Sequence, residues 1–457
     1  MIEKLRKLLN GKKVLILGFG REGQSTYQLI RSFSPETPLT IADSNEIHTE
    51  AKKIGESDQY VNIILGKFYL DEINKHNLIF KSPGISLQNI SLNPDTILSS
   101  QTQVFLGAYS SQTIGITGTK GKSTTSSLIY HILKEAGRDC ILVGNIGIPA
   151  FSATRNIKSD TIIVYELSGH QLESVNVSPH VAILLNIFEE HLDHFGNFDR
   201  YVKSKTKIAE FQKENDFMII NNDQPDLLNY LPKILKSKKL GFSLIPNLNA
   251  QCFVEDEIIY LNINAAQISI INTIETENLI GKHNQYNIMA AILACTEVGL
   301  SPNQIRNGIK SFHSLEHRLE YVGFFKGIHF YNDSISTIPE ATIEAVKSLP
   351  DTDTLILGGF DRGINYDHLI QFLVGSDVKN FIFMGPAGKR MKSVLDDYEL
   401  SGKFVFEANS LEEAFVHVLN ATAAEKICLL SPAAASYNAF KNFEERGNLY
   451  KKIARNL

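Results

Sequence analysis

The chain has 457 residues, of which 43% are hydrophobic and 21% are charged. This length predicts two or three domains, and this composition is typical of a globular protein that buries several cores. The formal net charge of −5 excludes electrostatic support for a nucleic-acid partner, so we expect none.

The first predicted unit, residues 1–106, has the pattern of a Rossmann-like domain. An apolar run precedes the glycine turn Gly18-Phe-Gly-Arg-Glu-Gly23, and a helical stretch and a second strand follow, ending at Asp43. A strand, glycine turn, helix and strand with an acid about twenty residues later are typical of dinucleotide binding. Residues 78–85 indicate another strand that runs into a loop at the same sheet edge. The turn suits any nucleotide diphosphate, so NAD, a nucleotide-linked substrate, or a tight turn without a ligand all stay open.

The second predicted unit, residues 107–312, contains a phosphate-binding loop. Strand 113–117 leads into Gly118-Thr-Lys-Gly-Lys-Ser123, and a helix follows to residue 136. Backbone N–H groups of such a loop cradle polyphosphate oxygens, while Lys122 supplies charge and the Ser123 hydroxyl joins a Mg²⁺ shell. The alternative is a glycine turn that merely starts a helix, but the strand before and the helix after favour nucleotide binding.

Two further strands of this unit, residues 161–165 and 181–185, end at polar side chains. These side chains belong to Glu166, Ser168, Asn186, Glu189, Glu190 and His191. Because ligands bind beyond the carboxyl ends of parallel strands, we expect this group to meet the phosphate loop. Oxygen ligands with an imidazole suit Mg²⁺ or Mn²⁺, although solvated loop carboxylates are the alternative. Residues 203–207 contain three lysines, and one of them could face this metal site.

The remaining pattern predicts three consecutive α/β domains: N-terminal Rossmann-like, central P-loop ATPase-like and C-terminal Rossmann-like. Residues 251–277 alternate as antiparallel strands do, and helix 284–298 closes the second unit. The third unit, residues 313–457, begins within a polar joint at residues 311–318. Its predicted strands alternate with helical stretches and cover residues 327–331, 354–357, 380–384 and 426–430.

Cysteine use and hydropathy lead to expectations about location. The four cysteines are widely spaced and form no Cys-x-x-Cys pair, which argues against a disulfide framework or a zinc site. We find neither a signal-peptide pattern nor about eighteen consecutive apolar residues. We therefore expect a cytoplasmic protein without a membrane partner, and we expect a monomer.

Motifs along the whole chain lead to a family resemblance. They are Thr117-Gly-Thr-Lys-Gly-Lys-Ser-Thr-Thr125, Gly144-Asn-Ile-Gly147, Glu166-Leu-Ser168, Leu185–Asp193, Gly281–Asn287, His317-Arg318, Asn332-Asp-Ser334 and Leu430–Ser436. In this order they resemble the Mur ligases of peptidoglycan synthesis, and residues 431–447 are most similar to the glutamate-adding branch. The resemblance implies an ATP-dependent ligase that joins glutamate to UDP-N-acetylmuramoyl-L-alanine through an acyl phosphate.

The resemblance also implies a role for each matching position. The UDP-substrate would bind at Gly18, Arg21, Glu22, Asp43, Ser82, Gly84, Asn145, Ser168 and Gln171. ATP would bind at Gly118, Thr119, Lys120, Gly121, Lys122, Ser123, Thr124, Asn284, Asn287, Arg318 and Asp333. Mg²⁺ would be held by Ser123, Glu166, His191 and a carbamylated Lys205. Glutamate would contact Thr337, Arg362, Ser436 and Phe443. The catalytic set would be Lys122, Lys205, His191 and Arg318.

Two positions depart from the pattern of the D-glutamate-adding branch. A lysine usually follows Asn-Asp-Ser there, but Ile335 stands in its place, and Arg362 stands near the place of a second lysine. Arginine pairs with a carboxylate through two parallel hydrogen bonds, so we expect acidic amino-acid binding to survive. Ser336 and Thr337 would replace part of the lost contact. Residues 332–337 also resemble a branch that adds L-glutamate, so D-glutamate is the expected substrate and L-glutamate is the alternative.

Three other interpretations are less favoured. Folylpolyglutamate synthetase shares the central and C-terminal units but lacks an N-terminal Rossmann unit, so residues 1–106 argue against it. A catalytically silent nucleotide-binding relative would not need Lys122, Ser123, Glu166, His191 and Lys205. A NAD-dependent dehydrogenase would leave the phosphate loop unexplained.

Overall fold

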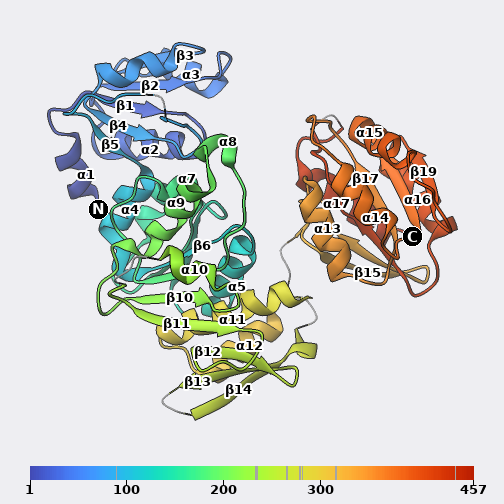
Figure 1. Cartoon of the computed structure of the whole chain (residues 1–457). Coiled ribbons are helices and arrows are strands. Elements are labelled where there is room, and N and C mark those ends of the chain that lie inside the picture. The colour runs from blue at the N-terminus through green and yellow to red at the C-terminus, as the bar shows by residue number, and fades with distance from the viewer. Residues whose placement is uncertain are drawn as a thin grey trace. The chain divides into compact units, whose positions relative to one another are not determined.

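The computed structural model describes residues 1–457 except residues 89, 232–234, 264–265, 277–278, 280, 314–315 and 438. Parts of the predicted antiparallel stretch, the polar joint and the C-terminal motif therefore lie outside the described residues. The chain forms two compact units, Met1–Glu275 with His283–Phe312 and Thr276–Lys282 with His313–Leu457. Three sheets with flanking helices confirm the predicted α/β class (Figure 1). The three domain limits stay predictions, and residues 106 and 107 lie inside one helix.

The first sheet is parallel with strand order β3-β2-β1-β4-β5. Its strands are β1 (Val14–Leu17), β2 (Leu39–Asp43), β3 (Val61–Leu65), β4 (Leu78–Lys81) and β5 (Ile97–Ser99). The helices of this part are α1 (Ile2–Leu9), α2 (Arg21–Phe33), α3 (Thr49–Ser57), η1 (Tyr69–Lys75) and α4 (Gln101–Tyr109). The strand order reverses between β1 and β4, so the loops after these strands form the crevice where such sheets bind ligands.

The second sheet has the order β14-β13-β12-β11-β10-β9-β6-β8-β7, and β12, β13 and β14 are antiparallel as predicted. Its strands are β6 (Thr113–Thr117), β7 (Cys140–Gly144), β8 (Ile162–Glu166), β9 (Val181–Leu184), β10 (Phe217–Asn221), β11 (Lys238–Ser243), β12 (Ala250–Glu255), β13 (Ile258–Ile263) and β14 (Ala266–Asn272). The helices around it are η2 (Ser110–Gln112), α5 (Lys122–Glu135), α6 (Ala150–Ala153), η3 (Thr154–Asn156), α7 (Gly169–Leu172), α8 (Leu192–Phe195), α9 (Phe198–Glu210), α10 (Asp226–Tyr230), η4 (Thr273–Glu275), α11 (Lys282–Glu297) and α12 (Pro302–Ser311).

The third sheet has the order β15-β16-β20-β17-β18-β19, with only β15 antiparallel to its neighbour among the described strands. Its strands are β15 (Glu320–Phe325), β16 (Ile328–Asn332), β17 (Thr352–Gly358), β18 (Asn380–Met384), β19 (Phe404–Ala408) and β20 (Ile427–Leu430). The helices are α13 (Pro339–Ser348), α14 (Asp367–Val374), α15 (Gly385–Leu395), α16 (Leu411–Ala421) and α17 (Phe443–Arg455).

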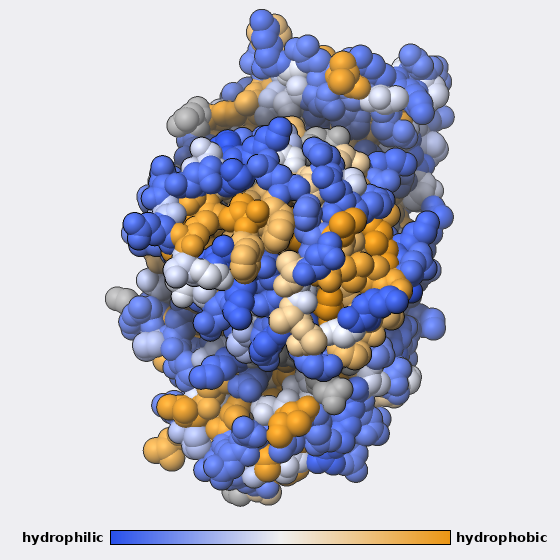
Figure 2. All heavy atoms as spheres, turned by 90° about the vertical axis from the view of Figure 1, so that its right-hand side faces the viewer, coloured by the Kyte–Doolittle hydropathy of each residue, from blue (hydrophilic) through white to orange (hydrophobic). Residues whose placement is uncertain are grey.

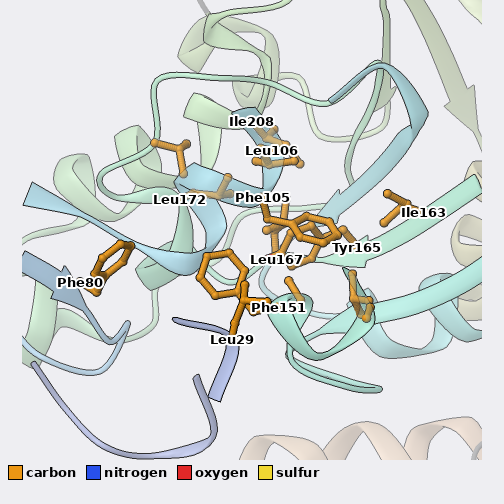
Figure 3. Packing of buried hydrophobic residues seen from close by; sticks show 14 of the residues in the cluster. Leu29, Phe80, Phe105, Leu106, Phe151, Ile163, Tyr165, Leu167, Leu172 and Ile208 are labelled. Atoms are coloured by element: carbon orange, nitrogen blue, oxygen red, sulfur yellow. The ribbon is translucent and has the colours of Figure 1, made fainter. Parts of the chain in front are cut away.

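One apolar core joins the first two sheets (Figure 3). Phe105 of α4 lies edge-on to Tyr165 of β8 with ring centroids 5.6 Å apart, and Leu29 of α2 and Phe151 of α6 belong to the same cluster. Gln101 adds polar links, because its side chain donates to Ser25 and accepts from the Phe151 N–H. Burial of aromatic rings contributes strongly to stability, so this joint holds the two sheets together.

The surface is mostly hydrophilic with separate apolar patches on the face shown in Figure 2. Exposed large apolar side chains include Phe404 of β19 and Val416 of α16. Scattered exposed apolar residues are normal in globular proteins. Within the described part of the chain, we find no helix whose length and hydropathy would let it cross a membrane.

Candidate functional site

The phosphate loop connects the end of β6 to the start of α5. Gly118 and Gly121 have φ of +157° and +85°, backbone conformations that favour glycine. A Cβ at Gly121 would overlap the Asn287 side-chain oxygen, so the close approach of α11 also requires glycine there. The helix N-terminus that follows presents backbone N–H groups, which are suited to an anion.

The end of β9 holds this loop in place through Asn186. Its backbone carbonyl accepts from the Thr119 N–H at 3.0 Å, and its side chain exchanges hydrogen bonds with the Lys120 backbone at 2.8 and 3.1 Å. The Thr119 hydroxyl and the Tyr201 hydroxyl are 2.9 Å apart. Asn186 is one of the polar residues predicted after this strand and expected to meet the phosphate loop, although no specific role was assigned to it. The structure brings it to the loop because β9 pairs with β6.

Two lysines converge on the loop. Lys122 Nζ donates to the carbonyl oxygens of Gly118 and Thr119 at 2.8 and 2.9 Å. Lys205 Nζ, from α9, donates to the same Gly118 carbonyl at 2.8 Å, and Lys205 is only 2% exposed. Of the three lysines in residues 203–207, Lys205 therefore faces the loop, whereas Lys203 is exposed and Lys207 binds the Glu173 carbonyl.

Burial, together with the nearby Lys122 charge, lowers the pKa of Lys205 well below its usual value. Desolvation disfavours the ammonium form, and a second cation disfavours it further. The physical consequence is an amine that loses its proton more readily than an exposed lysine does. A neutral amine is a nucleophile, which a charged lysine is not.

Glu166 ends β8, paired with Ile116 in register, and thus lies one strand from the loop. Its Oε1 accepts from Asn145 Nδ2 at 3.2 Å, while its buried Oε2 has no hydrogen-bond partner among the described residues. An unpaired buried carboxylate oxygen costs free energy unless a cation or donor meets it. This oxygen therefore fits the predicted Mg²⁺.

The other predicted metal ligands are less closely gathered. His191 has φ of +59°, its side chain is 50% exposed, and its Nε2 lies 3.7 Å from Glu190. Glu190 in turn pairs with Lys120 Nζ at 3.0 Å. Among the residues that the structure describes, no three His, Cys, Asp or Glu side chains are arranged to hold a metal. The set of Ser123, Glu166, His191 and Lys205 stays a prediction.

The two asparagines of α11 are buried next to the loop. Asn287 Oδ1 accepts from the Thr125 hydroxyl at 3.1 Å, and its Nδ2 donates to Asn284 Oδ1 at 3.0 Å. The structure thus brings Asn287 to the phosphate-loop helix. Contact of either asparagine with adenine stays a prediction.

The N-terminal crevice unites the loops after β1, β2 and β4. Gly18 has φ of +87°, and its carbonyl accepts from the Ser82 hydroxyl at 2.8 Å. Asp43 Oδ2 accepts from the Phe19 N–H at 2.6 Å, so this carboxylate supports the glycine turn. Gly84 is exposed at the rim of the crevice. These four predicted substrate residues lie at the topological switch point, where nucleotides bind such sheets.

Arg21 and Glu22 reach from α2 to the second sheet. Arg21 Nη2 donates to the Gly147 carbonyl at 2.7 Å, and Glu22 Oε1 accepts from Gln171 Nε2 at 2.7 Å. Gln171 also completes a capping box with Ser168 at the start of α7. Glu22 therefore links the crevice to Gln171, another predicted UDP-substrate residue.

Glu22 is half-buried, but its Oε2 is buried and has no partner among the described residues, and desolvation is the main cause that raises the pKa of this carboxyl. The folded protein thus holds the proton more tightly than the unfolded chain, so stability falls as pH rises from the usual carboxyl value through the raised one. We expect Glu22→Gln to remove this loss and to raise the free energy of unfolding at pH 8 above that of the wild-type chain. Urea unfolding at several pH values measures the free energy of unfolding, with the exposed Glu56→Gln as the control. A Glu22→Gln variant that is less stable than the wild-type chain at pH 8 would contradict this prediction.

The compact unit formed by Thr276–Lys282 and His313–Leu457 contains the remaining predicted site residues. Asp333, at the end of β16, accepts from the Ser431 hydroxyl at 2.8 Å, and burial raises its pKa to about 6. Arg318 has a buried Nε without a partner within the described residues. Arg362 donates a hydrogen bond to the Thr337 carbonyl. The structure thus brings these two predicted glutamate-binding residues together.

The other two predicted glutamate-binding residues lie shortly before α17 and at its start. Ser436 is buried in the loop after β20, and Phe443 is the first residue of α17. The Phe443 carbonyl accepts from the Ser334 hydroxyl at 2.8 Å, which ties it to the loop after β16. Two loops and one helix start thus meet at the carboxyl end of the third sheet.

Comparison with known proteins gives the family. Residues 116–295 match the Mur ligase middle domain, and residues 12–102 match the N-terminal domain of MurD-like Mur ligases. A UDP-N-acetylmuramoylalanine–D-glutamate ligase of Thermoanaerobacter sp. (strain X514) is 32% identical, covering 98% of this chain and 99% of that protein. The chain belongs to the Mur ligase family. The enzyme of the same name from Clostridium tetani is 31% identical and covers 99% of each chain.

Solved structures agree on the fold. The UDP-N-acetylmuramate-alanine ligase of Thermotoga maritima superposes with a TM-score of 0.57 at 17% identity, covering 97% of this chain and 99% of that one. A MurF ligase of Thermotoga maritima in complex with ADP also has a TM-score of 0.57, at 17% identity over 97% and 95% of the two chains. The Mur ligase fold therefore extends over both units, and the predicted family is confirmed.

Proposed function

We propose that this Mur ligase joins D-glutamate to UDP-N-acetylmuramoyl-L-alanine with hydrolysis of ATP to ADP and phosphate. The observation that carries this function is the convergence of Lys122 and Lys205 on the Gly118 carbonyl, one strand from the unpaired oxygen of Glu166. The names of the full-length relatives support D-glutamate as the amino acid. A phosphate loop alone would support only nucleotide binding.

The proposed chemistry needs no protein nucleophile. An alanyl carboxylate oxygen attacks the γ-phosphorus of ATP, which gives an acyl phosphate and ADP. The glutamate amine then attacks the acyl carbon, phosphate leaves, and the nitrogen loses a proton to complete the amide. Loop N–H groups and Lys122 hold the phosphates and offset the charge that develops on them. Arg318 and Asp333 stay proposed ATP-binding residues, as the family resemblance implies.

A divalent cation belongs to this proposal. Ser123, Glu166, His191 and Lys205 would hold it, and when bound it would neutralise charge on the transferred phosphate. A lysine amine is not a metal ligand beside another cation, but its carbamate is an anionic oxygen ligand. Carbamylation of Lys205 therefore reconciles a buried lysine with a metal site.

The nearest rival is ligation of L-glutamate, which the replacement of a lysine by the half-buried Ile335 favours. We expect phosphate release in the presence of UDP-N-acetylmuramoyl-L-alanine, ATP and Mg²⁺ to depend on D-glutamate, with a rate at least about tenfold above that with L-glutamate, about 1.4 kcal/mol of discrimination. The Arg362–Thr337 contact supports retained binding of a carboxylate at this place. Turnover with L-glutamate alone would move the assignment to the rival, and turnover with neither would refute the ligase.

A further inference from the structure

A buried guanidinium underlies the loops at the carboxyl end of the third sheet. Arg446, in the first turns of α17, is only 3% exposed. Its Nε and Nη2 donate to the Ser334 hydroxyl and carbonyl at 3.0 and 2.8 Å. Its Nη1 donates to the carbonyls of Ala434 and Ala435 at 3.1 and 3.4 Å. One side chain therefore links the loop after β16 to the loop after β20.

The loop after β17 rests on the same group. The Phe360 N–H donates to the Ala435 carbonyl at 2.8 Å, and the Gly358 N–H donates to the Pro432 carbonyl at 2.8 Å. A Cβ at Gly359 would overlap the Ala435 carbonyl oxygen and lie 3.1 Å from Arg446 Nη1, so glycine lets this loop pack against the Ala435 backbone and the guanidinium beside it. Three loops from three neighbouring strands are thus assembled around one cation.

Among the described residues, no carboxylate is within hydrogen-bond or ion-pair distance of this guanidinium. Within the described residues Arg446 forms no ion pair, and its acceptors are one hydroxyl and backbone carbonyls. Burial lowers its pKa to about 10, opposed by the negative charge of Asp333, so the group stays protonated at neutral pH. Burying a charge that no carboxylate pairs with directly is costly, and the more distant Asp333 offsets only part of that cost. Such a group is better explained by a functional role than by folding.

The loops that Arg446 joins carry the residues proposed for glutamate. Ser436 directly follows Ala435, and Phe443 shares the first turns of α17 and binds Ser334. Ala433 has φ of +54°, a strained conformation for a non-glycine residue that the surrounding contacts must hold. The lysine expected after Ser334 is replaced by Ile335, so Arg446 supplies a positive charge directly behind this loop.

We propose that Arg446 is a positioning residue that fixes the glutamate-binding loops and supplies the buried positive charge that favours an acidic substrate there. This inference rests on the proposed function and adds to it a residue that does not itself need to touch glutamate. Lysine at this position would keep the charge but lose the forked donors, and glutamine would lose both.

The test compares Arg446→Lys and Arg446→Gln with the wild-type chain, using the exposed Arg455→Gln on the same helix as control. Phosphate release is measured while glutamate and ATP are varied separately, and thermal unfolding checks each variant. We expect KM for glutamate to rise about tenfold in Arg446→Lys and by up to about a hundredfold in Arg446→Gln. KM for ATP should stay within about threefold of wild type, and Arg455→Gln should match wild type throughout.

An unchanged KM for glutamate in Arg446→Gln would overturn the proposal. Equal rises in both KM values would also overturn it, because they would indicate a merely structural role. If Arg446→Gln does not fold, Arg446→Lys decides by the same two measurements. Failure of the proposed function is distinct, since wild-type protein would then show no glutamate-dependent phosphate release.

Discussion

Replacing Lys122 by alanine should lower glutamate-dependent phosphate release by on the order of 10²–10³-fold, with little loss of fold. Its ammonium group is held over the loop by the Gly118 and Thr119 carbonyls, where it can meet the phosphates of ATP. Electrostatic stabilisation of the transferred phosphate is a large part of catalysis in phosphoryl transfer, so a missing point charge raises the barrier directly. Initial rates at saturating ATP and glutamate measure this effect.

The control for this experiment lies on the same helix. Lys134 is in the last turn of α5 and is exposed, so Lys134→Ala should keep the wild-type rate. Thermal unfolding of Lys122→Ala should show a folded protein, because the glycines and Asn186 still shape the loop. A Lys122→Ala rate within about twofold of wild type, less than about 0.5 kcal/mol in the barrier, would remove Lys122 from the reaction.

The phosphate loop was predictable because its determinants are local. Gly118 and Gly121 supply backbone conformations that other residues rarely adopt, and a buried strand and a helix flank them in the sequence. The strands that end at Glu166 and Leu184 were predicted for the same reason, from short apolar runs, with their ends placed one residue away at 165 and 185. Local sequence patterns were therefore enough to predict where these strands end and most of the candidate metal ligands that follow them.

What the sequence did not indicate depends on contacts between distant segments. The residue pattern alone did not separate Lys205 from Lys203 and Lys207, and only the family resemblance selected it, because the choice rests on which face of α9 packs against β6. The shared core of Phe105 and Tyr165 could not be predicted either, since each is only an apolar residue in its own segment. The role of Arg446 likewise arises from three loops that meet only in the fold.

Two strands of the third sheet were missed for a different reason. β15 and β19 lie at the two edges of that sheet, and their residues are mostly exposed or half-buried. Edge strands lack the continuous apolar run that marks a buried parallel strand. The missed strands do not carry any predicted site residue. Their omission therefore affected the predicted strand order more than the predicted site.

Replacing Lys205 by alanine should lower phosphate release by on the order of 10²-fold or more, and millimolar acetate or formate should restore part of it. Burial and Lys122 lower the pKa of this amine, so its neutral form is favoured and can add to CO₂, forming an N–C bond and releasing a proton. The resulting carbamate offers oxygen atoms to a cation, and a small free carboxylate can occupy the same place after truncation.

The lowered pKa of Lys205 also determines how activity depends on pH. Acid protonates the amine and prevents its addition to CO₂, so at fixed CO₂ wild-type activity should fall as pH falls through the lowered pKa of Lys205. Removing CO₂ from the buffers should lower wild-type activity and leave Lys205→Ala unchanged. The exposed Lys203→Ala, on the same helix, should keep both the rate and the CO₂ dependence of wild type. Full activity of Lys205→Ala without added carboxylate would show instead that the lysine only braces the Gly118 carbonyl, and the metal would then need another ligand beside Glu166.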